Sequence, residues 1–153
     1  MTDPLVETWE INARINEYVL AALSPATLSA AASSGGRTAG EALAHIHNVR
    51  LMWLKAAAPE LLAGLEKIEK GTVTSAMLAR ALGASAKAIA DLVTRSLAGG
   101  GKVKGFKPHV HAFVGYLIAH ESHHRGQIAL ALKQSGKPLD KKIAYGIWEW
   151  GAR

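Results

Sequence analysis

Apolar side chains recur every three or four residues along most of the chain, which is the spacing of one face of an α-helix. The first such stripe runs from Ile11 to Ala22. It lies in a helix predicted to begin at Pro4, with Asp3 as the N-cap, and to end near residue 23. The loop that follows has weak periodicity and small polar side chains, and it has room for one helical turn.

A second helix is predicted to begin where Thr38 and Glu41 form a capping box. It is expected to continue to about Ala58, directly before Pro59. The connection from Pro59 to Thr74 is too long for a tight turn. We expect it to contain a short helix of its own.

A third helix is predicted over residues 74–97, where another apolar stripe recurs. The glycine-rich run 98–108 interrupts it, and a fourth helix is predicted over residues 108–135. Residues 140–150 place apolar side chains on one side, which suits a short terminal helix packed over the others.

These elements predict an all-α fold, with four long amphipathic helices, no strands and a short C-terminal helix. This is the pattern of a four-helix bundle. The long connections after the first and second helices indicate a topology other than simple up-down-up-down. The length of 153 residues fits one domain over residues 1–153.

The composition limits the possible metal ligands and binding partners of the chain. The chain has no cysteine, so any metal must be held by His, Asp or Glu. The net charge of +6 raises the question of nucleic acid, but the basic residues are spread thinly, and the densest group is Lys102, Lys104 and Lys107. No recognised nucleic-acid motif accompanies them, so a solvated basic surface is favoured.

With no secretory signal and no apolar run of about 18 residues, we expect a cytoplasmic protein without a membrane segment.

The histidines are the most informative side chains. His120 and His124 are four residues apart, so they lie about 6 Å apart on one helix face and can converge on one ion. Both continue the apolar stripe of the fourth helix. The alternative is that each is a core histidine satisfied by one hydrogen bond, on two adjacent turns. His45 lies on the apolar face of the second helix and supplies a third inward imidazole.

The remaining histidines are poorer ligands. His47 is rotated by about 200° from His45 and cannot serve the same ion. His123 lies nearer to solvent than His124, and it is a further candidate for a ligand or for a base beside the metal. Surface, rim or helix-contact positions are expected for the other three: His47, His109 and His111.

Three neutral imidazoles leave coordination positions open for water or a substrate, as in catalytic metal sites. Ligation by nitrogen alone suits Zn²⁺, Ni²⁺, Fe²⁺ or Cu²⁺ and disfavours Ca²⁺ and Mg²⁺, which require oxygen. The sequence therefore predicts one divalent transition-metal ion.

Two segments, LAHIHNVRLMWL and HESHHRGQIALALKQSG, resemble the DinB/YfiT-like metalloprotein family. The H-x-x-x-H-R-G-Q motif, preceded by the histidine of "AHI", corresponds to the metal triad of that family, here His45, His120 and His124. The resemblance covers nearly the whole chain. It implies an up-down-down-up four-helix bundle, a homodimer, and one nickel or zinc ion. Family members include transferases and isomerases that use a low-molecular-weight thiol such as mycothiol, bacillithiol or glutathione.

Three further motif residues are not ligands. Arg125 is expected to anchor a carboxylate or to pair across helices, and Gly126 to permit close contact between helices. Gln127 is expected to orient a ligand imidazole through a hydrogen bond. Each of these roles has a purely structural alternative.

Three functions stay open. The first is a metal-dependent transferase or hydrolase in which the metal lowers the pKa of bound water or of a thiol. Its catalytic residues and substrate are unassigned, because Glu121 is expected to point away from the metal and His123 is the other candidate base. The second is a metal-binding stress-response module without turnover, and the third is nucleic-acid binding.

Trp148 and Trp150 lie in a short tail that can hardly bury both, which also favours a homodimer.

Overall fold

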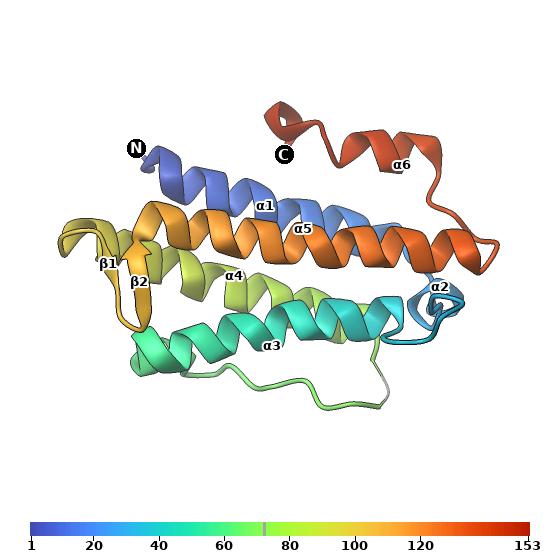
Figure 1. Ribbon diagram of the computed structural model, residues 1–153, viewed down its shortest axis with the longest axis horizontal. Helices are drawn as coiled ribbons and strands as arrows, with labels where there is room; N and C mark the ends of the chain where they lie inside the picture. Colours follow the sequence, from blue (N-terminus) through green and yellow to red (C-terminus); the bar gives the residue numbers. More distant parts are fainter. Residues whose placement is uncertain (72) are drawn as a thin grey trace.

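The computed structural model describes residues 1–71 and 73–153. Four long helices lie side by side (Figure 1): α1 (Pro4–Ala21), α3 (Ala39–Ala57), α4 (Ser75–Ala98) and α5 (Val110–Gln134). In this view α1 and α5 run in one direction, and α3 and α4 run in the other. The four long helices expected from the apolar stripes are therefore present, with ends that differ from the predicted ones by a few residues.

Short helices occupy the connections and the C-terminal segment. They are α2 (Pro25–Leu28), the 3-10 helices η1 (Pro59–Leu62) and η2 (Trp150–Ala152), and α6 (Lys141–Gly146). The single helical turn after α1, the short helix after α3 and the terminal helix all match the expectations. Tyr18 packs closely against Gly146, where a Cβ atom would clash with its ring and hydroxyl. Glycine at this position thus lets α6 approach α1.

Local capping signals set several helix ends. The side chain of Asp3 accepts a hydrogen bond from a first-turn amide of α1. At the start of α3, Thr38 Oγ1 accepts from the amide of Glu41, and Glu41 Oε1 accepts from the amide of Thr38, both at 3.1 Å. This reciprocal pair is the predicted capping box. A second capping box, between Ser24 and Thr27, starts α2 and was not predicted.

The expectation of no strands is wrong. The glycine-rich run forms an antiparallel hairpin of β1 (Lys102–Val103) and β2 (Phe106–His109). Gly105 lies between the strands with a φ of +87°, a conformation that other residues rarely adopt. The helix α5 begins two residues later than predicted because His109 is its N-cap, accepting a hydrogen bond from a first-turn amide through Nδ1.

Buried polar side chains separate two apolar clusters along the four long helices. One cluster includes Trp9, Phe113 and Leu117, and the other includes Leu43 and Ile128. Apart from Ser96, the polar residues of the long helices that are at most 8% exposed fall between the segments that supply the two clusters: Asn12, Asn16, His47, Arg50, Ser85, Glu121, His124 and Arg125. We call this set the polar layer. It lies at the level of the candidate ligands His120 and His124.

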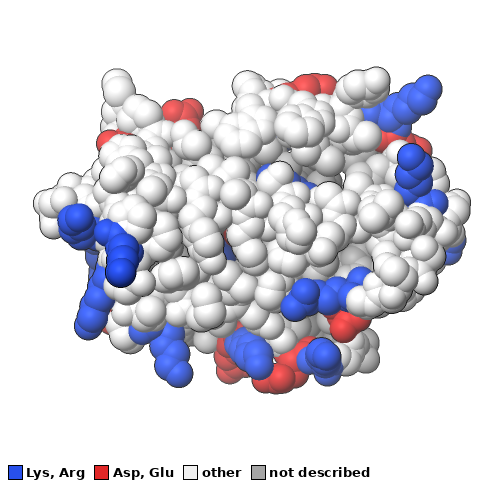
Figure 2. Space-filling view, viewed as in Figure 1, with Lys and Arg blue, Asp and Glu red and all other residues white. Residues whose placement is uncertain are grey.

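Charged side chains are distributed over the surface. Figure 2 shows lysine and arginine side chains scattered around the edge of one face, with a broad uncharged area between them. Among the described residues, no helix combines the length and apolarity needed to cross a membrane.

Candidate metal centre

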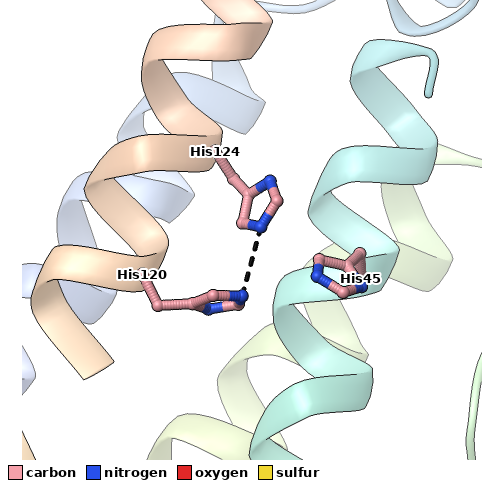
Figure 3. Close-up of side chains that lie close together, drawn as sticks. All are labelled: His45, His120 and His124. Carbon is pink, nitrogen blue, oxygen red and sulfur yellow. Dashed lines mark hydrogen bonds between the residues drawn. The ribbon is translucent and has the colours of Figure 1, made fainter. Parts of the chain in front are cut away.

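Three imidazoles from two helices converge at the level of the polar layer. Figure 3 shows His45, on α3, facing His120 and His124, on α5. The ring centroid of His124 lies 4.6 Å from that of His45 and 4.6 Å from that of His120, and the His45–His120 distance is 5.3 Å. One nitrogen from each ring lies within 4.8 Å of the corresponding nitrogen of the other two. The three residues expected from the sequence are thus brought together.

These distances fit a shared metal ion. Two nitrogens bound to one tetrahedral ion at about 2.0–2.1 Å lie about 3.3–3.4 Å apart. The Nε2 atoms of His120 and His124 are 3.1 Å apart, which is close to that value. Every pair of ligand nitrogens lies within 4.8 Å, so no pair is more than about 1.5 Å further apart than a shared tetrahedral ion requires.

Gln127 fixes the orientation of one imidazole. The Nδ1 atom of His124 lies 2.8 Å from Gln127 Oε1, one helical turn further along α5. Because the amide oxygen can only accept, Nδ1 carries the proton and Nε2 keeps its lone pair directed at the cluster. A hydrogen bond of this kind commonly fixes the tautomer of a metal-binding histidine. This contact is the one expected for Gln127.

Burial keeps all three imidazoles neutral. It is the largest cause that lowers the pKa of His45 to about 4, and the charge of Arg37 is the next. Burial likewise lowers the pKa of His120 and of His124 below the ordinary value. The neutral rings have lone pairs available for a metal at pH 7. In addition, His120 Nδ1 is buried without a hydrogen-bond partner among the described residues.

Glu121 lies beneath the histidines and points into the core. Arg50 donates to it from Nε to Oε1 at 2.7 Å and from Nη2 to Oε2 at 2.9 Å. The Nδ2 atoms of Asn12 and Asn16 donate to the same Oε2 at 2.8 and 2.7 Å. With four hydrogen bonds and 1% exposure, Glu121 is unavailable as a general base, in keeping with the expectation that it points away.

Arg125 pairs across helices through amides. Its Nη1 donates to Asn12 Oδ1 at 2.9 Å and to Asn16 Oδ1 at 2.8 Å. The same two asparagines also donate to Glu121, so they link the two charges. Sequence analysis did not find Asn12, Asn16 or Arg50. The two asparagines had a signal in the sequence, because they are four residues apart on the otherwise apolar face of α1.

The other histidines and Gly126 differ in their surroundings from the three converging rings. His47 is only 1% exposed, and its Nε2 lies 2.8 Å from the backbone oxygen of Glu66. It therefore contacts the segment after η1, and a surface position is wrong for it. His123 is exposed, with its ring centroid 5.0 Å from that of His124. The close contact expected at Gly126 is also wrong, since a Cβ atom there would meet nothing within 4 Å. As expected, two others are exposed: His109 and His111.

A cavity of about 590 Å³ opens beside His45. Its walls are formed by the start of α3 and by residues 67–70 of the connection between η1 and α4. A second cavity, of about 240 Å³, includes Gln127. Gly36 and Arg37 line both cavities. Small molecules therefore have a route to the His45 side of the cluster.

The model of the DinB family matches residues 1–142, which confirms the resemblance carried by the two histidine segments. No curated protein and no solved structure gives a significant match. The family assignment therefore rests on the family model.

Proposed function

Since the chain belongs to the DinB family, we propose that it is a metal-dependent enzyme that binds one divalent ion through His45, His120 and His124. The observation that carries this proposal is the convergence of three neutral imidazoles from two helices, with ligand atoms within 4.8 Å of one another. Zinc and nickel are the ions we propose, and iron(II) is also compatible with three nitrogen ligands.

The proposed reaction class is a thiol-dependent transfer or a hydrolysis on a small molecule. A divalent ion at this position supplies a Lewis acid that lowers the pKa of a bound water or thiol. Three protein ligands leave room for such a group, and the cavity beside His45 gives it access. Gln127 orients the His124 ring, while burial keeps the imidazoles unprotonated.

Two structural proposals accompany the function. The directions of the four long helices in Figure 1 support an up-down-down-up four-helix bundle. We also propose a homodimer, because Tyr145 and Trp148 of the C-terminal segment are 71% and 77% exposed. Large apolar side chains grouped in this way commonly mark a protein–protein contact.

Metal analysis tests the ligand set. Untagged protein, purified without a nickel column, should contain about one divalent ion per chain by mass spectrometry. The variant His124→Ala should lose this ion, because two imidazoles hold a metal far more weakly than three. The matched control is His123→Ala, which removes the exposed neighbouring histidine and should leave the metal content unchanged. Equal metal content in both variants would refute the ligand assignment.

A thiol screen tests the enzymatic part. Cobalt(II) replaces zinc in tetrahedral sites and is coloured, so direct thiol binding changes its absorption spectrum. We expect small thiols to change the spectrum of the cobalt-loaded protein and to be consumed in the presence of an electrophile. A protein that binds the metal but neither binds nor converts any thiol, and hydrolyses no ester or amide in the same screen, would instead be a metal-binding module without turnover.

A further inference from the structure

The cavity beside His45 has an excess of positive charge. Its basic lining residues are Arg37, Lys67 and Lys70, and its acidic lining residues are Glu41 and Glu69. Lys67 and Glu69 form an exposed ion pair at 3.8 Å. Glu41 is engaged in the capping box with Thr38. Both carboxylates thus already have partners, and the lining carries a formal charge of +1.

The surroundings of the cavity add to this positive charge. Three neutral imidazoles leave the full charge of +2 on a bound divalent ion. The polar layer, to which His124 belongs, contains Arg50 and Arg125 with Glu121 as its one carboxylate, so it contributes a further +1. A ligand that enters the cavity thus meets positive charge from a bound metal, from the cavity wall and from the polar layer. This field favours an anion.

Arg37 is the cation best placed to hold the anion. It lines both cavities, of which one includes His45 and the other includes Gln127, the residue that orients the His124 ring. Among the described residues, no ion pair joins Arg37 to a carboxylate. Its planar guanidinium is free to form the paired hydrogen bonds that match a carboxylate.

The opposite wall of the cavity is fixed to α3. Asn48 Nδ2 donates to the backbone oxygen of Ile68, and the backbone amide of Ile68 donates to Asn48 Oδ1, both at 2.9 Å. The His47 side chain, also on α3, forms a hydrogen bond with the backbone oxygen of Glu66, next to Lys67. The segment that carries Lys67 and Lys70 is thus attached to the same helix that carries the ligand His45. Such attachment pre-organises a binding site.

We propose that this cavity is a subsite for the carboxylate of a small substrate. Arg37 binds the carboxylate, and the reacting group of the same molecule faces the metal at His45. The proposal rests on the proposed function and adds the substrate class: small molecules with an anionic carboxylate close to the group that reacts. Lys67 and Lys70 add positive charge around the site without contacting the carboxylate of the substrate directly.

Two thiols that differ in a single charge test the subsite. 3-Mercaptopropionate and its methyl ester are titrated into the cobalt-loaded protein, and each dissociation constant is measured from the cobalt spectrum. We expect the wild-type protein to favour the carboxylate by roughly tenfold or more, as for a hydrogen-bonded charged group. In Arg37→Met this preference should fall towards one, while Arg37→Lys should keep part of it. The difference in thiol reactivity between the probes is the same for every variant, so the change in the ratio reports the subsite.

A charge control and a metal-free measurement complete the experiment. Lys104→Met removes a basic side chain from the hairpin, outside the cavity, and should leave the preference unchanged. In metal-free protein, propionate should shift the NMR amide signals of residues 36–37 and 67–70, and Arg37→Met should abolish these shifts. An equal affinity for both thiols in the wild type would overturn the subsite while leaving the metal function intact. If the protein proves unable to bind a divalent ion while propionate still shifts these signals, the proposed function is overturned and the anion site stands.

Discussion

Replacing Glu121 by Gln should destabilise the protein strongly. The carboxylate accepts four hydrogen bonds and faces Arg50, and both side chains are 1% exposed. Glutamine preserves the volume but removes the only negative charge of the polar layer, and its amide nitrogen would face the donors of Arg50. Removing one partner of a buried ion pair costs about 3–5 kcal/mol of unfolding free energy. For a chain of this length that corresponds to a fall in melting temperature of roughly 6–20 °C.

The assay is urea unfolding followed by circular dichroism, in the presence of a chelator so that metal binding does not contribute. The matched control is Glu60→Gln. Glu60 pairs with Arg95 at the same distance of 2.7 Å, but these side chains are 62% and 55% exposed, so we expect a loss below about 1 kcal/mol. The double variant Arg50→Met with Glu121→Leu should be more stable than Glu121→Gln, because it also removes the buried Arg50 charge that Glu121→Gln leaves without its carboxylate. A loss for Glu121→Gln that is no larger than that of Glu60→Gln would refute the reasoning.

Three further predictions concern the metal, the pH and the assembly. Chelation should leave the helical circular dichroism unchanged and lower the melting temperature only by the free energy of metal binding; loss of helicity would indicate a structural metal. The pKa of His45 is about 4 in the folded protein against about 6.5 when unfolded. In the metal-free protein, the part of the unfolding free energy that is linked to His45 should therefore be fully present above pH 6.5. It should be lost as the pH falls towards 4, because the unfolded chain then takes up more protons. Urea unfolding of His45→Gln should show a weaker pH dependence. Light scattering should give twice the chain mass for the wild type and a reduced mass for Trp148→Glu, and a wild-type monomer at high concentration would contradict the dimer.

The histidine cluster could be predicted because its signal is local. The spacing of His120 and His124 places them on one helix face, and the apolar neighbours of His45 indicate that it points inward. Once the two helices pack with their apolar faces together, the three rings meet. The capping box of Thr38 and Glu41 was predictable for the same reason, since both partners lie within one turn.

The parts that sequence analysis missed depend on partners far apart in the chain. Arg50 and Glu121 are 71 residues apart, and either alone resembles a charged residue of a solvated helix face. His47 is buried because the segment that carries Glu66 crosses over it, and that segment has no helical or strand periodicity. The hairpin strands have two and four residues, which is too short for a period-two pattern to emerge.

The polar layer and the histidine cluster depend on the same pair of helices. Arg50 follows His45 by five residues on α3, and Glu121 follows His120 by one residue on α5. The ion pair between them therefore fixes the separation and register of α3 and α5 within about two turns of the three imidazoles. Because this buried pair already orders the helices, a metal ion bound by the three imidazoles would not have to order them, and most of its binding free energy would remain available as affinity. The buried ion pair, which adds little net stability compared with apolar packing, is then best explained by the position it gives to the ligands.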